Sequence, residues 1–188
     1  MRVLVLVTVV VWLAGELALR LPQRRRAERT VTREWRSLLV IWAGGWIGGF
    51  AAGILAKHAS ALDLPFHRTL WIAVGVAIAW CGIALRLWAI GTLGRYFKPI
   101  VHLQQDHHVV RSGPYKVLRH PAYTGLLLAL FGISLTFANI ASIAVFNCCI
   151  VAAILYRIRV EERTLLDGLG DEYAEYRRHT RRLIPGVW

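Results

Sequence analysis

Residues 112–125 read SGPYKVLRHPAYTG and lie between two strongly apolar stretches. A connecting loop needs only one or two turn-forming residues, but this segment holds two prolines, two glycines, two tyrosines and an Arg-His pair. Gly113-Pro114 favours a turn, and the His120-Pro121 step ends any preceding helix. Pro121 suits the first turn of the next helix, where free backbone N–H groups can bind a carboxylate or a phosphate. The composition therefore indicates a binding segment.

A second polar cluster, YRIRVEERTLLDGLGDEYAEY at 156–176, follows the last apolar stretch. Arg157 and Glu161 are four residues apart and share one face of a helix. One interpretation is an ion pair at the membrane boundary. The other is a ligand site, in which the carboxylate receives an ammonium or ribose hydroxyls and the arginine clamps a carboxylate with two N–H groups. The residues alone leave both open, and they assign no role to Glu162 or Arg119.

The histidines of the first polar segment do not predict a metal site. They lack a tight ligand spacing and no cysteine accompanies them in the loop: His102, His107, His108 and His120. The sequence has no GxGxxG fingerprint, P-loop or serine nucleophile elbow. Cys81, Cys148 and Cys149 fall within apolar stretches, which predicts packing residues rather than a disulfide framework.

The elements that must position these residues are membrane helices. Of the 188 residues 56% are hydrophobic, eight are tryptophan and the mean hydropathy is +0.48, values typical of a polytopic membrane protein. Apolar blocks cover 3–19, 38–56, 70–90 and 124–156. About 20 apolar residues span a bilayer, so the last block predicts two helices, with a break at Phe137-Ala138-Asn139. We expect an all-α integral membrane protein with about five spans.

The net charge of +12 comes mainly from basic residues in the segments between and after the apolar blocks. Segments 20–36 and 157–188 hold seven arginines each and 91–123 holds five basic residues, whereas 57–68 holds two. Because basic loops stay in the cytoplasm, the N-terminus is expected outside, and both long basic segments and the C-terminus inside. Topology and anionic lipid headgroups account for the charge, and no nucleic-acid partner is expected.

Two features within the apolar blocks bear on packing. Gly44-Gly45 and Gly48-Gly49 have the small-residue spacing that allows two helices to approach closely. Glu16 and Arg86 are costly in lipid, so each faces either the bundle interior or, by snorkelling, the membrane interface.

The segments 94–125 and 156–176 lie on the same side of the membrane and flank the helical hairpin 124–156. The fold must therefore bring them together, and a cytoplasmic pocket built from the 94–125 loop and the C-terminal helix region is expected.

The strings GPYKVLRHPAYTG, EER and GDEYAEYRRHTRRLIP together resemble the isoprenylcysteine carboxyl methyltransferase family. Its members are integral membrane enzymes that use S-adenosylmethionine and are related to phospholipid methyltransferases. The resemblance covers about residues 85–186. It implies a single membrane domain, 1–188, in which 1–84 forms N-terminal transmembrane helices and 85–188 the catalytic methyltransferase region.

The resemblance implies a set of cofactor contacts from the loop, the following helix start and the last long helix: His102, His107, His108, Val109, Val110, Tyr115, His120, Pro121, Ala122, Tyr123 and Glu161. It also implies that Arg157 binds the acceptor carboxylate and takes part in catalysis. His102 stands where the family has a glutamine, which leaves the role of that position open.

The acceptor class implied is lipophilic: an isoprenylcysteine-like or other lipid-like carboxylate, on a small molecule or a prenylated protein. A carboxylate needs no general base because it is ionised near neutral pH. A phenol or amine acceptor would need one, for which His102 or His107 is available. An NADPH-dependent sterol-reductase-like enzyme and a non-catalytic membrane subunit are the alternatives from other classes. The compact length suggests a prokaryotic inner or plasma membrane protein whose active site faces the cytoplasm.

Overall fold

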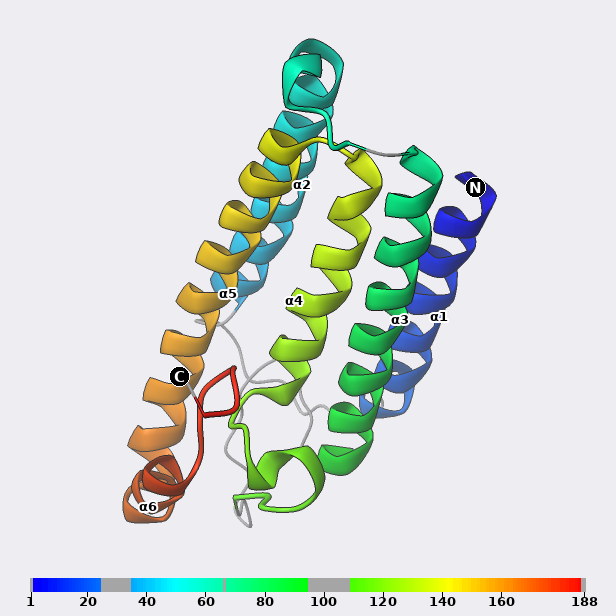
Figure 1. Cartoon of the computed structure of the whole chain (residues 1–188). Helices are drawn as coiled ribbons and strands as arrows, with labels where there is room; N and C mark the ends of the chain where they lie inside the picture. Colours follow the sequence, from blue (N-terminus) through cyan, green and yellow to red (C-terminus); the bar gives the residue numbers. More distant parts are fainter. Residues whose placement is uncertain (1, 25–34, 66, 95–108, 187–188) are drawn as a thin grey trace.

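The computed structural model describes residues 2–24, 35–65, 67–94 and 109–186. Within these residues all regular structure is helical apart from two isolated β-bridges, which confirms the predicted all-α fold (Figure 1). The α-helices are α1 (Arg2–Arg24), α2 (Trp35–His58), α3 (Arg68–Leu93), α4 (Pro121–Ser134), α5 (Ile140–Leu169) and α6 (Asp171–His179). The described connections also contain short 3-10 turns: η1 (Ser60–Leu62), η3 (Gly113–Lys116) and η4 (Leu135–Phe137).

The five long helices stand side by side in the order α1, α3, α4, α5, α2 and alternate in direction along the chain (Figure 1). The start of α1 and the connection between α2 and α3 lie at one end of the bundle. The other end carries η3, α6 and the C-terminal tail. We call it the polar end and define it by residues 109–120 and 170–186. The described parts of the two polar segments thus meet at one end, as predicted, and residues 95–108 of the first lie outside the described residues.

Among the described residues, three helices are long and apolar enough to cross a membrane: Leu39–His58 within α2, Arg68–Leu93 and Ile140–Leu169. Val3–Ala18 and Pro121–Phe137 are shorter apolar helices. Large apolar side chains point away from the bundle, such as Trp46, which is 75% exposed. Outward-facing apolar residues of this kind are expected where lipid is the solvent. The chain is an integral, multi-pass membrane protein.

Glycines set the two closest helix contacts. A Cβ added to Gly125 of α4 would lie 2.6 Å from the backbone oxygen of Gly82 in α3. Further along the same two helices, a Cβ added to Gly132 of α4 would likewise lie against the backbone of Gly75 in α3. The predicted packing role of Gly44 and its neighbours is confirmed, because a Cβ on Gly44 would lie 3.1 Å from the Ala153 side chain of α5. Backbone contact therefore fixes α3 against α4 and α2 against α5.

The predicted break between the last two spans is confirmed. Ala138 has a positive φ of 52°, and Asn139 caps α5 by accepting a hydrogen bond from the backbone N of Ser142 at 3.1 Å. The same side chain donates to Asp63 Oδ1 and to the carbonyl of Ala59, each at 2.8 Å. One buried asparagine thus turns the hairpin and attaches it to the loop between α2 and α3.

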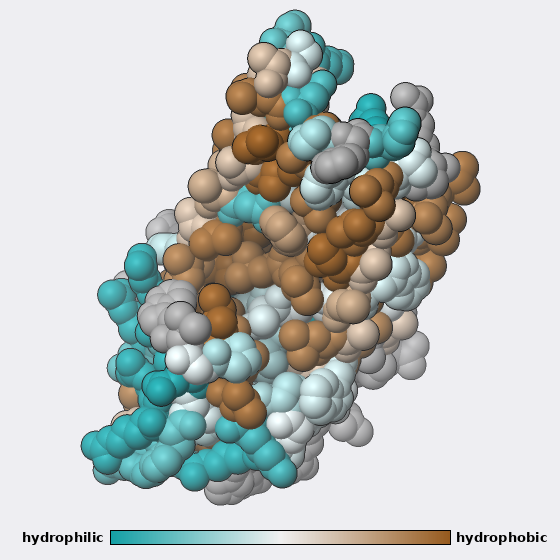
Figure 2. All heavy atoms as spheres, viewed as in Figure 1, coloured by the Kyte–Doolittle hydropathy of each residue, from teal (hydrophilic) through white to brown (hydrophobic). Residues whose placement is uncertain are grey.

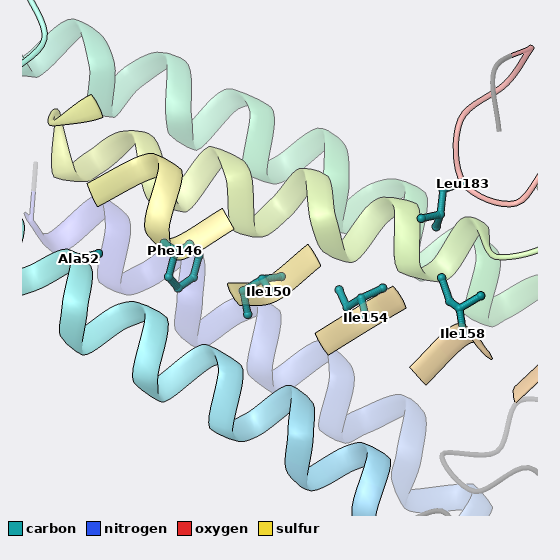
Figure 3. Packing of buried hydrophobic residues seen from close by; sticks show 6 residues of the cluster. All are labelled: Ala52, Phe146, Ile150, Ile154, Ile158 and Leu183. Atoms are coloured by element: carbon teal, nitrogen blue, oxygen red, sulfur yellow. The ribbon is translucent and has the colours of Figure 1, made fainter. Parts of the chain in front are cut away.

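The core of α5 repeats every four residues. Phe146, Ile150, Ile154 and Ile158 are buried along one face, together with Ala52 of α2 and Leu183 of the C-terminal tail (Figure 3). Figure 3 shows Leu183 beside Ile158, at the end of the series nearest the tail. The next position on this face is Glu162, which is also buried. The apolar stripe therefore leads directly into the polar end.

Glu16 of α1 and Arg86 of α3 form a buried ion pair, with 8% and 5% of each residue exposed. Nη1 of Arg86 also donates to the carbonyl of Ala122, in the first turn of α4, at 3.0 Å. Of the two environments considered from the sequence, the bundle interior is the one that both residues occupy.

Candidate active site

The start of α4 and the last turns of α5 bring three functional groups into contact. The Tyr123 hydroxyl donates to Oε2 of Glu161 at 2.8 Å, and Nε of Arg157 donates to the Tyr123 oxygen at 3.2 Å. Nε of Arg157 lies 3.9 Å from the Glu161 carboxylate. The Arg157 side chain is 2% exposed and that of Glu161 is 22% exposed. The pair that the sequence spacing predicted therefore exists, with a tyrosine hydroxyl between its members.

Glu162 lies at the centre of a separate, buried charge cluster. Its carboxylate accepts from Nε of Arg119 at 3.0 Å and from Nη2 of Arg182 at 2.8 Å, and His120 Nε2 is 3.3 Å away. These partners come from the loop before α4 and from the C-terminal tail, so one carboxylate of α5 joins three segments. Sequence reasoning missed this role. The four-residue spacing of the buried residues from Phe146 to Ile158 continues to Glu162, and this spacing could have predicted that Glu162 is buried.

His120 lies between the two glutamates. Its Nε2 faces Glu162, and its Nδ1 is 3.9 Å from Oε1 of Glu161. The ring packs beside Tyr123 with 5.8 Å between centroids, and the residue is 4% exposed. His120 therefore lies within reach of both the enclosed carboxylate of Glu162 and the more exposed carboxylate of Glu161.

The C-terminal tail runs alongside the segment before α4. The backbone N of Arg119 donates to the Arg181 carbonyl at 2.7 Å, that of His120 to the Arg182 carbonyl at 3.1 Å, and that of Arg181 to the Val117 carbonyl at 2.9 Å. Nη1 of Arg119 donates to the carbonyls of Arg177 and Thr180. Residues some 60 positions apart therefore hold the loop in a fixed path.

Helix α6 supports the Gly-Pro-Tyr turn from below. The buried Tyr176 hydroxyl donates to the carbonyls of Tyr115 at 2.8 Å and Leu118 at 3.2 Å, and burial raises the pKa of Tyr176 to about 12. Glu172 accepts from the backbone N of Val109 at 2.9 Å. The motif GDEYAEY thus acts by positioning the loop.

Tyr115 is 6% exposed and packs with Ala89, Ile90 and Ala122. Its hydroxyl makes no hydrogen bond within the described part of the chain. Burial raises the pKa of Tyr115, and the negative charge of Glu161 raises it further. A buried hydroxyl normally has a partner, so this one is suited to a ligand.

The described residues of the predicted site lie at one end of the bundle, but not all face the same environment. Val109 and Val110 are half-buried beside α6 and Tyr115. Pro121 is fully buried and Ala122 packs against α3, so their side chains take part in helix contacts. His102, His107 and His108 lie outside the described residues.

These observations define a class: a multi-pass membrane protein of packed apolar helices with a buried polar site between the start of one helix and the C-terminal half of the next. Residues 73–167 match the model of the isoprenylcysteine carboxyl methyltransferase (ICMT) family, which is half of the chain. The chain belongs to this family of methyltransferases.

Named relatives agree with this assignment. A probable protein-S-isoprenylcysteine O-methyltransferase of Oryza sativa subsp. indica is 28% identical over 138 residues, which are 71% of this chain and 72% of the relative. The protein-S-isoprenylcysteine O-methyltransferase of Schizosaccharomyces pombe is 32% identical over 158 residues, 80% of this chain and 66% of the relative. The family match includes α4 and most of α5 but not α1, α2 or α6.

The fold has a counterpart among solved structures. The eukaryotic intramembrane Ras methyltransferase ICMT superposes with a TM-score of 0.62 at 22% identity, over 95% of this chain. The alignment spans 63% of that chain, so this protein covers less than two thirds of the solved enzyme's length.

Proposed function

We propose that the protein is an S-adenosylmethionine-dependent methyltransferase that O-methylates the carboxylate of a lipophilic, isoprenylcysteine-like acceptor. The carrying observation is the Arg157–Tyr123–Glu161 contact between the start of α4 and the C-terminal half of α5. It places a cationic group that suits a carboxylate next to an anionic group that suits a cationic cofactor. The family membership supports the same reaction class.

The residues present fit the cofactor. Glu161 keeps part of its surface accessible, whereas the neighbouring Glu162 is enclosed by its three partners. A carboxylate in this position suits an ammonium group or ribose hydroxyls, and the Tyr115 hydroxyl provides a second polar contact. Val109, Val110, Tyr115, His120, Tyr123 and Glu161 would hold the group, joined by His102, His107 and His108 as the resemblance implies. When bound, S-adenosylmethionine supplies an electrophilic methyl group attached to a sulfonium.

Arg157 would hold the acceptor. Its planar guanidinium can bind a carboxylate through two parallel N–H groups, and its buried side chain is held against α4 by the bond to Tyr123. Figure 2 shows an apolar face that is hollowed between α4 and α5, and the apolar side chains of Leu126, Leu127 and Leu130 pack toward the α5 core. We propose that the apolar part of the acceptor lies there and enters from the lipid.

The chain's own groups would act by orientation and by exclusion of water. An acceptor carboxylate is ionised near neutral pH and requires no general base. Charge is neutralised as the methyl group moves, so a site with little water favours the transition state. Correct alignment alone provides effective molarities of about 10⁵ M or more. Tyr123 would link the two halves of the site by bonding Glu161 and Arg157.

We further propose that the protein resides in a prokaryotic plasma membrane with the polar end in the cytoplasm. The basic residues of the polar end, such as Arg111, Lys116 and Arg119, support its placement in the cytoplasm. The partners would be membrane lipids and a lipid-soluble or prenylated acceptor.

Methyl transfer from labelled S-adenosylmethionine to an S-prenylated cysteine with a free carboxyl group would test the proposal. The matched control is the same compound with its carboxyl group amidated, which removes only the nucleophile. Long-chain phenols, phosphatidylethanolamine and NADPH with a sterol substrate complete the series. Methylation of the free acid alone is expected. Product from a phenol or amine, sterol reduction, or binding of no cofactor would each overturn the assigned reaction.

A further inference from the structure

The polar end contains a surface hollow of about 300 Å³ that is separate from the Arg157–Tyr123–Glu161 contact. It is lined by Arg119, Ala174, Arg177 and Arg178. Three arginines and the small Ala174 therefore line one space, and no acidic residue is among the lining residues described. An opening of this character attracts an anion.

Arg119 is the buried and fixed residue among those that line the hollow. Its side chain is 10% exposed and is fixed by three bonds: Nε to Glu162 at 3.0 Å and Nη1 to the carbonyls of Arg177 and Thr180. Within the described residues Nη2 has no hydrogen-bond acceptor. A buried charged group normally satisfies its donors, so a fixed guanidinium with both Nη2 donors left over at a hollow indicates a missing acceptor.

The neighbouring acids do not neutralise the hollow. Glu162 is enclosed between Arg119, His120 and Arg182. Glu175 contacts Arg178 at 3.0 Å, but both side chains are exposed, at 47% and 76%, and an exposed pair of this kind is weak and screened by salt. Arg177 has no carboxylate partner among the described residues. The hollow therefore carries an excess of positive charge.

We infer that this hollow is a binding site for the phosphate group of an anionic membrane phospholipid. Arginine side chains suit the oxygens of a phosphate group, and three arginines line this one hollow. The hydrophilic end around α6 adjoins the apolar helical face, as Figure 2 shows, which is where headgroups lie when the helices span the bilayer. Because Arg119 also bonds Glu162, an occupied hollow would hold the loop, α5 and the C-terminal tail together.

The experiment uses the full chain in detergent, titrated with phosphatidylglycerol or phosphatidylcholine, with bound lipid measured by native mass spectrometry. The test variant is Arg177→Gln with Arg178→Gln. The matched control is Arg159→Gln with Arg163→Gln, which removes the same charge from exposed positions on α5. One basic side chain near an anionic headgroup contributes about fivefold to binding, so the test variant is expected to bind phosphatidylglycerol about 25-fold more weakly. The control is expected to retain most of the wild-type affinity.

A second variant, Ala174→Glu, keeps every arginine and places a carboxylate in the hollow, and it is also expected to lose phosphatidylglycerol. Affinity for S-adenosylhomocysteine verifies folding and is expected to be unchanged in all variants. Equal loss in the test and control pairs would overturn the inference. Weaker S-adenosylhomocysteine binding in the test pair would assign the hollow to the cofactor site instead. If inorganic phosphate binds as tightly as phosphatidylglycerol, the proposal that the bound phosphate group belongs to a lipid would be rejected.

Discussion

Glu161 and Glu162 are adjacent in the sequence, but their carboxylates lie in different environments. Glu162 continues the buried stripe of α5 and is enclosed by Arg119, His120 and Arg182. Glu161 is turned about 100° further around the helix, where it meets Tyr123 and Arg157 and stays partly exposed. One carboxylate therefore joins segments of the fold, and the other remains accessible to a ligand.

The two glutamates should give opposite results when each is changed to glutamine. Glu161→Gln is expected to abolish S-adenosylhomocysteine binding while the thermal unfolding midpoint stays near that of the wild type. Glu162→Gln is expected to lower the free energy of unfolding by about 3–5 kcal/mol, because it leaves buried cations without their counter-charge. Calorimetric titration and thermal unfolding in detergent measure both. Wild-type cofactor affinity in Glu161→Gln would show that the proposed site is misplaced.

Arg157→Lys keeps the positive charge but loses the planar fork. If Arg157 binds the acceptor carboxylate, kcat/KM should fall by about 100-fold or more, as expected for loss of a charged hydrogen bond of about 3 kcal/mol. S-Adenosylhomocysteine affinity should change little. The control is Arg159→Lys, an exposed arginine two positions away on α5, which should behave as wild type. Unchanged carboxylate methylation in Arg157→Lys would exclude the clamp role.

Alkaline pH should release the support that α6 gives to the Gly-Pro-Tyr turn. The pKa of Tyr176 is raised by burial to about 12 from an ordinary 10.0, so the neutral phenol is favoured in the folded state. Its contribution to stability is complete below pH 10 and is lost as the pH rises through 12. The unfolding midpoint of the wild type should fall over this range. In Tyr176→Phe the free energy of unfolding below pH 10 should be lower than in the wild type by about 1–3 kcal/mol, because two carbonyls lose their donor. Its unfolding midpoint should then decline less as the pH rises. Parallel curves for the two proteins would contradict this role.

The α3–α4 contact should not tolerate a single added methyl group. Gly125→Ala places a Cβ 2.6 Å from the backbone of Gly82, which forces the helices apart and should reduce the yield of folded protein and S-adenosylhomocysteine binding together. Gly53→Ala is the control, since a Cβ there has nothing within 4 Å and alanine favours a helix by about 1 kcal/mol. A folded Gly125→Ala protein as stable as the wild type would show that this contact is adjustable.

Topology can be measured by cysteine labelling in whole cells, with the three native cysteines replaced. A membrane-impermeant reagent added outside should label Ser60→Cys, between α2 and α3, and should miss Asp171→Cys at the start of α6. Both positions are exposed, so accessibility within the protein does not distinguish them. The reverse pattern would place the polar end outside and reject the orientation derived from the basic loops.

The sequence by itself determined the helices, their approximate ends and the hairpin break at Phe137-Ala138-Asn139. These features depend on properties local to the chain: the length of an apolar run, and an asparagine that can cap the helix that follows it. The motif residues Tyr123, Arg157 and Glu161 could also be named in advance, because the four-residue spacing fixes a helix face and the resemblance supplies the chemistry.

Only the tertiary structure decided which groups meet across long separations. The pairing of Glu16 with Arg86, the bonds between the C-terminal tail and the loop before α4, and the hollow around Arg119 each join segments tens of residues apart. No local pattern encodes such contacts, because an ionised side chain in an apolar helix gains its partner only after the helices have packed. The close approach of α3 and α4 has the same explanation. Nothing in the sequence around Gly75 and Gly82 predicts this contact, because it exists only where Gly132 and Gly125 pack against them.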